Sequence, residues 1–515
     1  MATPTPPAAI RSSVRRALAP LAPVLVVLGF ALGRALGGTL GWALPLAAAA
    51  CGSTSGNRDQ SQSRPPARRD HGVKGDRGTA ASPPAGSAAG SRVPDADSAV
   101  LAAAATAPPD ADFAPAWAAL APARTVGHVF DPTRSEVDNG ALLRAAVARL
   151  QPGDRLEVGP GRYSVAARFG IALAGRADAP IRIVGTGGAV LTRPDSSQNT
   201  VDFDFARFVT LQGFEIVGGD TALKMYDCGD LWIDRCHVHH CGGVGLAANS
   251  SDTARLWITR NEVHDTSGQG GEGMYLGANH GEFVTHHSVV AQNHVYRCGG
   301  SQGDGIELKQ GSYANRIVAN EVHDTNYPCI LVYGTAGREV NVIERNVCYR
   351  SGDNVMQVQG EAIVRNNLLC AGGGAGFASH DHQGQTRDLV VVHNTILTRG
   401  RGADLRSWGS RPGMVFANNA VHSERGDALW VGGAGRGVTL CGNVVCGRVR
   451  GVDAGFVHGR GLEDFEGAGY DGIERDVRPS RGSTLRGGAA ARFTVHDDLT
   501  GAMRQAPIAV GCRQP

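Results

Sequence analysis

Lysine is almost absent from this chain of 515 residues, which contains only Lys74, Lys224 and Lys309. Aromatic residues make up only 6% of the composition. The formal net charge is +2, so no excess of positive charge favours nucleic acid as a partner. Glycine is abundant by contrast, with 72 residues and no Gly-X-Y period, which argues against collagen and indicates many tight turns. Lysines that persist in so arginine-rich a chain are therefore candidates for a specific role.

The N-terminal part of the sequence predicts an export signal over 1–51 and a disordered tether over 52–122. Three arginines precede an apolar run at 18–32, and a stretch of small residues ends at Cys51. This order resembles a bacterial lipoprotein signal, which would lipidate Cys51. An ordinary signal peptide or an uncleaved anchor is the alternative. Residues 52–122 are rich in Pro, Ala, Gly and Ser and poor in large apolar residues.

These features lead us to expect a secreted or cell-envelope protein, monomeric, that meets a membrane only through its N-terminal lipid or signal anchor. Ten cysteines follow Cys51 in the sequence. An exported chain could pair them as disulfides, but their spacing does not give the connectivity.

A repeat begins beyond residue 230, where an asparagine followed by any residue and then an aliphatic residue recurs every 20 to 32 residues. Such intervals are typical of coils of constant size with loops of varying length. Equivalent residues of stacked coils lie about 4.8 Å apart, so the asparagines predict a ladder of side-chain hydrogen bonds. The marker residues are Asn261, Asn293, Asn320, Asn346, Asn366, Asn394, Asn419 and Asn443.

A second column of residues supports the same register, because charges of alternating sign follow the markers at Asp265, Arg297, Asp324 and Arg350. A segment of helical spacing over 138–150, with Asp138 as its N-cap, would cover the open end of the stack. We therefore predict an all-β fold, a parallel β-helix over 123–460 with an N-terminal capping helix. Residues 461–515 lack the asparagine pattern, and we predict that they form a C-terminal cap over the final coil.

The strand before each asparagine alternates inward aliphatic residues with outward polar or aromatic ones. Rings pack against the C–H faces of sugars, while amides and bases bind hydroxyl groups, so this face favours an extended carbohydrate polymer. An ordinary solvated sheet face is the alternative. The candidate substrate-binding residues are Lys224, Tyr226, Tyr275, Gln357, Gln359, His380, Arg406 and Trp408.

The centre of this face is the stretch Asp304-Gly-Ile-Glu-Leu-Lys309, followed by Asn315-Arg-Ile-Val and by Cys329-Ile-Leu-Val-Tyr333-Gly. It resembles the core of the family-6 polysaccharide lyases, which include chondroitinase B and alginate lyases within the pectate-lyase-like β-helix superfamily. That resemblance implies a right-handed helix and lyase activity on an acidic, uronate-containing polysaccharide. Family members carry an acidic residue five before a catalytic lysine and an arginine on the next coil. Asp304 and Lys309 fit, but Tyr333 stands in the arginine's place.

Lyase chemistry needs a base, a group that neutralises the uronate carboxylate, and an acid for the leaving oxygen. Lys309 is the predicted base, and Tyr333 could transfer the second proton. Glu307 on the same face would favour the charged lysine and oppose this role. The conflict is relieved if Glu272, Asp304 and Glu307 hold Ca²⁺, which would neutralise the substrate carboxylate. Turn-capping is the alternative role for these three acidic residues.

Two rival functions use the same scaffold. The first is a surface protein that binds carbohydrate without catalysis. The second is a glycoside hydrolase with Glu272 and Asp304 as its carboxylate pair. The Gly-His-Gly of polygalacturonases and the Asp-Pro-His of the β-helix epimerases are both absent.

Two groups of histidines give weaker signals. His380-Asp381-His382 follows a strand about three coils from Lys309, a predicted separation of roughly 14 Å, too far to act on the same bond. The second group occupies one column and predicts a stack of rings rather than metal ligands, which must converge on one point. Its members are His239, His264, Tyr296, His323 and Tyr349.

Overall fold

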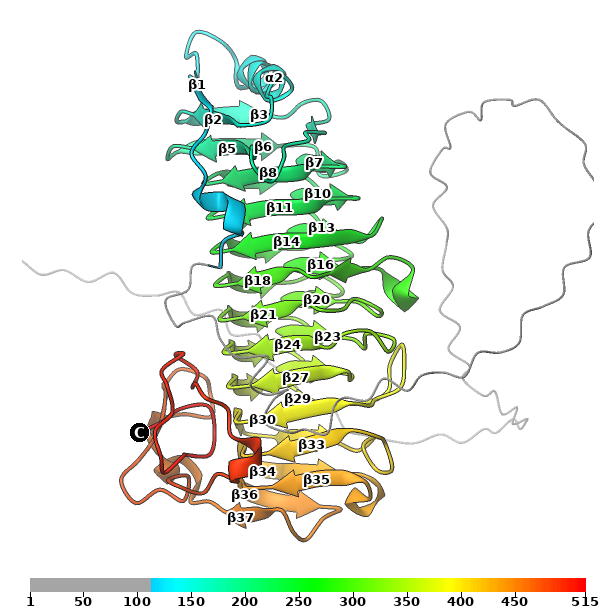
Figure 1. Ribbon diagram of the computed structural model, residues 1–515, viewed down its shortest axis with the longest axis vertical. Helices are drawn as coiled ribbons and strands as arrows, with labels where there is room; N and C mark the ends of the chain where they lie inside the picture. The colour runs from blue at the N-terminus through cyan, green and yellow to red at the C-terminus, as the bar shows by residue number, and fades with distance from the viewer. Residues whose placement is uncertain (1–112) are drawn as a thin grey trace, which may run out of the picture. The chain divides into compact units, whose positions relative to one another are not determined.

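Parallel strands stacked coil upon coil make up nearly all of the regular structure (Figure 1). The computed structural model describes residues 113–515. The predicted export signal and the tether up to residue 112 lie outside the described residues. Within 113–515, no helix is long and apolar enough to cross a membrane.

The strands form three ladders, and most coils contribute one strand to each. The first ladder consists, in order, of β1 (Arg124–His128), β2 (Asp154–Val158), β5 (Ile181–Gly185), β8 (Arg207–Gln212), β11 (Gly229–Asp234), β14 (Thr253–Thr259), β18 (Val289–Ala291), β21 (Arg316–Val318), β24 (Asn341–Glu344), β27 (Ala362–Arg365), β30 (Leu389–Val392), β33 (Met414–Ala417) and β35 (Val438–Cys441), with β17 (Thr285–His286) also paired to β14.

The second ladder follows the first around each coil. It consists of β3 (Gly161–Ser164), β6 (Ala189–Arg193), β9 (Glu215–Gly218), β12 (His237–His239), β15 (Glu262–Thr266), β19 (His294–Cys298), β22 (Glu321–Thr325), β25 (Val347–Ser351), β28 (Leu368–Gly372), β31 (Thr395–Thr398), β34 (Ala420–Val431), β36 (Asn443–Arg450) and β37 (Phe456–His458).

The third ladder completes the coil and carries the candidate site. It consists of β4 (Gly170–Ile171), β7 (Val201–Asp204), β10 (Leu223–Tyr226), β13 (Leu246–Ala248), β16 (Met274–Leu276), β20 (Ile306–Leu308), β23 (Ile330–Val332), β26 (Met356–Val358), β29 (Ala375–Ala378) and β32 (Arg401–Leu405). The long strand β34 then pairs with β31 of the second ladder and with β32 of the third.

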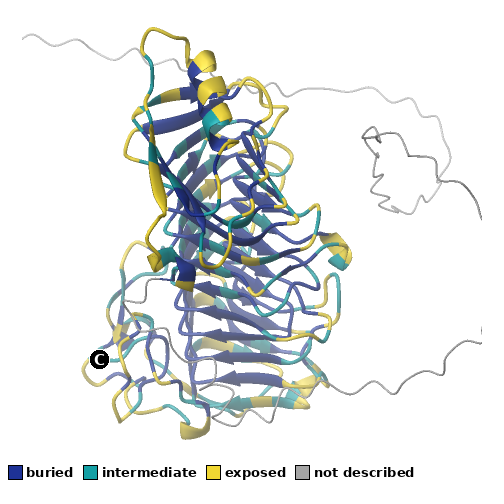
Figure 2. Cartoon of the chain, turned by 45° about the horizontal axis from the view of Figure 1, so that its top comes forward, coloured by how far each residue is buried: buried dark blue, intermediate teal, exposed yellow. Residues whose placement is uncertain are grey.

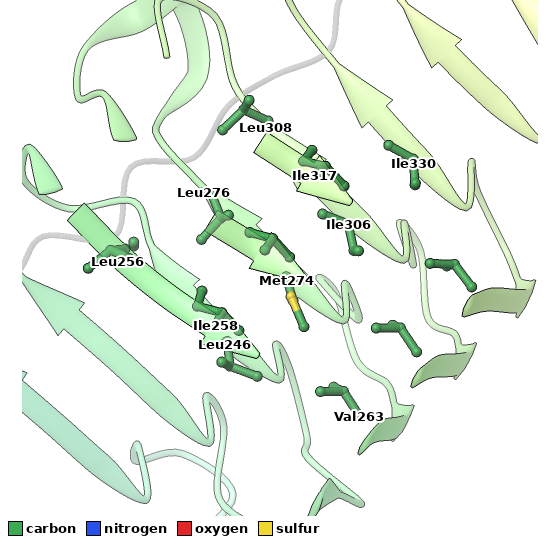
Figure 3. Packing of buried hydrophobic residues seen from close by; sticks show 14 of the residues in the cluster. Leu246, Leu256, Ile258, Val263, Met274, Leu276, Ile306, Leu308, Ile317 and Ile330 are labelled. Carbon is green, nitrogen blue, oxygen red and sulfur yellow. The ribbon is translucent and has the colours of Figure 1, made fainter. Parts of the chain in front are cut away.

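The core fills the space between the three ladders. Figure 3 shows aliphatic side chains such as Leu246, Met274 and Ile306 pointing inward from successive coils, and these three are fully buried. In Figure 2 the strands are buried along most of the stack, whereas exposure concentrates in the loops between them. Burial on one side and polar residues on the other explain the alternation in the sequence, because successive side chains of a strand point to opposite faces.

The predicted asparagine ladder is confirmed at the corner between the first and second ladders. The backbone N–H and Nδ2 of Asn261 both donate to Asn293 Oδ1, each at 3.0 Å. One marker is wrong by one residue, since Asn367 and not Asn366 continues the ladder. Asn366 adopts a left-handed φ of 55°. Its side chain therefore leaves the corner and donates to Asp497.

The predicted helix is α2 (Glu136–Val147), which packs against β3 and buries Leu143 and Val147. Its N-cap is Ser135 and not Asp138, because the Ser135 hydroxyl accepts from the Asp138 N–H at 3.0 Å. Figure 1 places α2 at the end of the stack next to β3.

A short N-terminal segment covers the outer face of the first ladder. It contains the 3₁₀ turn η1 (Ala116–Ala119), in which Trp117 meets the edges of Phe208, Trp232 and Trp257 at ring distances of 6.1–6.2 Å. Phe113 packs on Ala291 and Val318 of the same ladder. Residues 113–119 therefore pack against the first ladder, although they lie within the segment predicted as a tether.

The C-terminal segment lies along the sides of the later coils instead of over the final one. It contains η4 (Gly461–Asp464), the antiparallel pair β38 (Phe465–Ala468) and β39 (Arg475–Pro479), and η5 (Ala491–Phe493). Two further 3₁₀ turns, η2 (Asn279–Gly281) and η3 (Gly433–Gly435), lie in earlier loops. Phe465, Val477 and Leu485 pack on outward residues of the second ladder from Tyr349 to Val444. The apolar outer surface of those strands explains this position, because it would otherwise face water.

The ten cysteines from Cys228 to Cys512 are all unpaired in the described part of the chain. Eight of them are buried, and burial raises the pKa of Cys228 to about 11 and that of Cys236 to about 12. They act here as small core residues rather than as disulfide partners.

Candidate active site

The outward positions of the third ladder form one continuous column. Strand pairing puts these residues in register, in the order Lys224, Ala247, Tyr275, Glu307, Leu331, Gln357, Ala378, Asp404 and Trp430. The predicted register is thus confirmed from 274 to 333. Two residues further along each strand, Lys309 and Tyr333 extend a parallel column on neighbouring coils.

Trp408 was predicted on this face, and that prediction is wrong. The chain turns after β32, with the Trp408 N–H donating to the Leu405 carbonyl at 3.1 Å. The turn sends the indole into the core, where it is 0% exposed and meets Phe416. Arg406 does point outward, pairing with Asp404 at 2.8 Å and lying 4.7 Å from the Trp430 ring centre. Trp430 therefore supplies the ring expected from Trp408.

Three carboxylates converge at the start of β16 and β20. Glu272, Asp304 and Glu307 are only 3%, 1% and 2% exposed, and they bring ligand oxygens within 4.8 Å of one another. We call them the acidic trio. Gly273 and Gly305 follow the first two carboxylates, and a Cβ on Gly273 would lie 2.6 Å from the Gly305 carbonyl oxygen. Glycine thus lets successive coils approach closely where the carboxylates meet.

The acidic trio is poorly compensated. Within the described residues, Glu272 Oε2, Asp304 Oδ1 and Glu307 Oε2 have no hydrogen-bond partner. Burial raises the pKa of Asp304 well above its ordinary value, and the charges of Glu307 and Glu272 add to the effect. Burial also raises the pKa of Glu272, and raises that of Glu307 to about 7 even though Lys309 opposes the shift. Unpartnered buried oxygens are costly, so the arrangement favours taking up protons or a cation.

Lys309 lies against this trio, 6% exposed, in an ion pair with Glu307 Oε1. Its Nζ is 4.6 Å from the centre of the Tyr275 ring and 5.2 Å from that of Tyr333. Lys309 therefore contacts one carboxylate and the faces of two rings. Burial, aided by the charge of Glu307, raises the pKa of both tyrosines, so their hydroxyl groups stay protonated at neutral pH.

His382 belongs to this site, although its strand lies about three coils away. Its ring stacks on Tyr333 with a centroid distance of 5.1 Å. The loop after β29 folds back towards η2, where Gln383 Nε2 donates to Asn279 Oδ1 at 2.9 Å and Gln383 Oε1 accepts from the His280 N–H at 2.8 Å. The predicted separation of roughly 14 Å assumed an extended chain and is therefore wrong for His382. Burial lowers the pKa of His382, so its ring is neutral.

The remaining predicted binding residues lie on either side of this centre. Lys224 is hydrogen-bonded to Asn249 Oδ1 and lies 5.6 Å from the ring centre of Tyr226, and burial lowers its pKa. On the opposite side, Gln357 accepts from Asn354 Nδ2 at 3.0 Å, and Gln359 is 3% exposed. The structure thus brings Tyr275, Glu307, Lys309, Tyr333 and His382 together and leaves the others as flanking positions.

The acidic trio has the chemistry of a calcium site. All three donors are carboxylates, the ligands that Ca²⁺ prefers, and three of their buried oxygens lack a partner in the described residues. Glu272, Asp304 and Glu307 would be the residues that hold the ion.

Comparison with known proteins supports the fold. Residues 195–368 match the family model described as "Right handed beta helix region", a stretch that includes the trio and Lys309. No curated protein gives a significant match. The protein is therefore an all-β, right-handed parallel β-helix, as the sequence predicted.

Several solved structures have a similar arrangement of coils. Pectate lyase Pel9A is 14% identical, with a TM-score of 0.46 over 77% of this chain and 97% of that one. An alginate lyase from Paenibacillus sp. str. FPU-7 is 16% identical, with a TM-score of 0.41 over 64% and 99%. A mannuronic acid specific family 6 lyase from human gut microbiota is 12% identical, with 0.38 over 65% and 90%. At these scores the activities of those proteins say nothing by themselves about this chain.

Proposed function

We propose that the protein is an exported lyase, secreted or anchored in the cell envelope, that cleaves an acidic, uronate-containing polysaccharide by β-elimination. One observation carries this proposal. A buried, undercompensated carboxylate trio of the calcium-binding type adjoins a lysine that lies between two protonated tyrosines on neighbouring coils. Such a site combines the three groups that the reaction needs, namely a neutraliser of the substrate carboxylate, a base and an acid.

Ca²⁺ bound to the trio would neutralise the uronate carboxylate and so acidify the adjacent C–H bond. Lys309 Nζ, which lies beside Glu307, would accept the substrate proton as the base. The C–H electron pair forms the new C=C bond as the glycosidic C–O bond breaks. The Tyr333 hydroxyl is protonated and supplies the proton to the leaving oxygen. His382, stacked on Tyr333, acts as a positioning residue.

The polymer would lie along the third ladder across several coils. Tyr226 offers a ring face to sugars on one side of the centre, and the flanking amides Gln357 and Gln359 lie on the other. Lys224 and Arg406 supply positive charge at the two ends, where uronates of neighbouring sugar units would bind. His380 stays a predicted contact at the rim.

The rival hydrolase reading is less compatible with the geometry. A glycosidase pair must flank the sugar bond, with carboxyl groups about 5–5.5 Å apart for retention. Glu272 and Asp304 are 3% and 1% exposed and share their surroundings with a third carboxylate. Three carboxylates that converge on one point favour binding of a cation over flanking a sugar bond. The alternative is a binding protein without catalytic activity, and the experiment must distinguish it from a lyase.

The test is the ultraviolet absorbance of unsaturated uronate products. The full chain would be mixed with alginate, pectate, chondroitin and dermatan sulfates, and heparin, with Ca²⁺ and with a chelator. We expect a Ca²⁺-dependent rise on one of these polymers, and its loss in Lys309→Ala.

Lys224→Ala is the matched control, because Lys224 is the other lysine of the same face. Its removal should raise KM while kcat is largely kept. Binding of a polymer without any absorbance rise would replace the lyase by a binding protein. A rise that persists in Lys309→Ala would remove Lys309 from the mechanism.

A further inference from the structure

Histidines and glutamates gather on the outer face of the second ladder, on a different side of the coil from the acidic trio. The column of stacked rings predicted from the sequence is confirmed there. His264 lies between His239 and Tyr296, at centroid distances of 5.1 and 4.7 Å, and His323 lies between Tyr296 and Tyr349 at 5.2 and 4.6 Å. The stack fixes the ring planes of His264 and His323. Beside each of these rings lie one further histidine and one glutamate, which offer two more ligand atoms.

The first cluster is His237, Glu262 and His264. His237 is in register with Glu262 on the next coil, and His264 follows Glu262 by two residues on the same face. The Nε2 atoms of the two histidines are 2.7 Å apart, and the ligand atoms of all three residues lie within 4.8 Å of one another. This is the convergence on one point that the ring column alone lacks.

A carboxylate orients His264 from behind. Its Nδ1 lies 2.7 Å from Asp265 Oδ2, and Asp265 is itself held by Arg297 through bonds of 2.7 and 2.6 Å. A proton on Nδ1 leaves the lone pair on Nε2, which points into the cluster. Metal-binding histidines are typically fixed in this way by a carboxylate on the opposite ring nitrogen. The Tyr296 hydroxyl donates to Glu262 Oε1 at 2.6 Å and fixes the third ligand as well.

The same arrangement recurs two coils later with His294, Glu321 and His323. His294 is in register with Glu321, the two Nε2 atoms are 2.9 Å apart, and the ligand atoms again lie within 4.8 Å. The surrounding contacts recur as well. His323 Nδ1 lies 2.6 Å from Asp324, which Arg350 holds, and the Tyr349 hydroxyl donates to Glu321 at 2.7 Å.

We propose that each cluster binds one Zn²⁺ ion through two histidine Nε2 atoms and one glutamate oxygen. Two histidines and a carboxylate are a familiar zinc ligand set, and imidazole favours zinc over the hard cations that suit the acidic trio. Three protein ligands leave a coordination position for water. His237 and His294 are only half-buried, which gives the ion a path from solvent.

The two sites differ in one contact. Arg475 of the C-terminal segment lies 3.4 Å from Glu321 and over the Tyr349 ring at 4.2 Å. A guanidinium beside a ligand carboxylate competes with the metal, so the site at His294 is the weaker of the two. Removing the charge with Arg475→Gln should bring its affinity closer to that of the site at His237.

The experiment is a calorimetric titration of the chelator-treated full chain with ZnCl₂, in excess Ca²⁺ so that the acidic trio does not take up zinc. We expect two Zn²⁺ ions per chain. His237→Gln and His294→Gln should each remove one binding event, and the double variant should remove both. Asp265→Asn should weaken the first site about 10–100-fold, the effect typical of losing the carboxylate behind a ligand histidine. Co²⁺ in place of zinc should give visible absorption that the double variant lacks.

His286→Gln is the matched control. His286 and His287 also place ring nitrogens 2.8 Å apart, but they belong to no three-residue cluster within residues 113–515. This variant should keep both zinc ions. Glu262→Gln and Glu321→Gln repeat the test with conservative changes should a histidine variant fail to fold. The proposal is overturned if the wild-type chain binds no zinc, or if the double variant and wild type bind it equally. These readouts do not depend on lyase activity.

Discussion

Two groups of buried charges in the same β-helix differ in how far their charges are balanced. On the first ladder, Glu344 is 1% exposed and accepts from Arg365 Nη2 at 2.6 Å and from Arg316 Nη2 at 2.5 Å. On the third ladder, the acidic trio has Lys309 as its neighbouring cation. One group has two cations for one carboxylate, and the other has one cation for three.

The difference shows in the pKa values. Burial alone would raise the pKa of Glu344, but the charges of Arg365 and Arg316 bring it below its ordinary value. Equal burial raises the pKa of every member of the trio. The first cluster is complete and stabilises the fold, whereas the second is complete only with added protons or a metal ion. Burial alone therefore does not identify a candidate functional cluster of charges, whereas an incomplete balance of charged partners does.

The largest expected effect comes from removing Lys309, the lysine beside the acidic trio. Lys309→Met should lower kcat by about 10²–10⁴-fold, the usual contribution of a general base. The same variant should bind Ca²⁺ about tenfold more tightly, because a competing positive charge is gone. Product absorbance and calcium titration measure the two effects. Weaker calcium binding in Lys309→Met would contradict the assignment of the metal to the trio.

Single neutralising substitutions should change stability in opposite directions in the two clusters. Glu344→Gln removes the charge of the buried carboxylate that Arg365 and Arg316 share, and it should cost about 3–5 kcal/mol of unfolding free energy. Asp304→Asn relieves repulsion and should stabilise the calcium-free protein by about 1 kcal/mol at pH 8. Denaturant unfolding of the full chain measures both. Destabilisation by Asp304→Asn without calcium would show that the trio is balanced in some other way.

The raised pKa values predict a pH dependence of stability. A carboxyl group with a raised folded pKa keeps its proton while the unfolded chain loses it, so stability falls as pH rises from the unfolded pKa through the folded one. For Glu307 this window runs from 4.5 to about 7, and the loss is about 3 kcal/mol. With chelator, wild type should lose stability across this window relative to Glu307→Gln. Calcium should remove the difference, and an unchanged difference would argue against metal binding.

The smallest effect should come from an exposed pair. Arg297 bonds to Asp265 at 2.6 Å, but its side chain is 52% exposed. Arg297→Gln should therefore cost no more than about 1 kcal/mol in the same denaturant experiment, because water screens such pairs. A loss of unfolding free energy as large as that of Glu344→Gln would mean that side-chain exposure does not distinguish weak ion pairs from strong ones.

Local patterns predicted the fold and the centre of the site. Alternation within strands put Glu307 and Lys309 on one face, and the coil interval put Tyr333 beside Lys309, because both depend on short-range geometry. Even the error at Asn366 is local, since two adjacent asparagines compete for one corner and only the backbone decides which continues the ladder.

Long-range contacts could not be predicted in the same way. His382 reaches Tyr333 because Gln383 bonds to a loop more than a hundred residues earlier, and no period in the sequence encodes that contact. Trp408 turns inward because the strand ends at Leu405, whereas the alternation in the sequence suggests that it continues to Trp408. The ring column alone does not predict that His237 and His294 lie beside it, because each cluster combines residues from two neighbouring coils.

Segments from both ends of the described chain pack on the outer face of the first ladder, Trp117 on its earlier coils and Phe493 with Val495 on its later ones, and this order affects folding during synthesis. Trp117 is synthesised before the strands that bear Phe208, Trp232 and Trp257, so each of these can be covered as it leaves the ribosome. Ile363, Val390 and Val415 are covered by Phe493 and Val495, which come last. The apolar outer side of the later coils therefore stays exposed until Phe493 and Val495 have been synthesised, and chains that stop short of Phe493 should be the ones that aggregate.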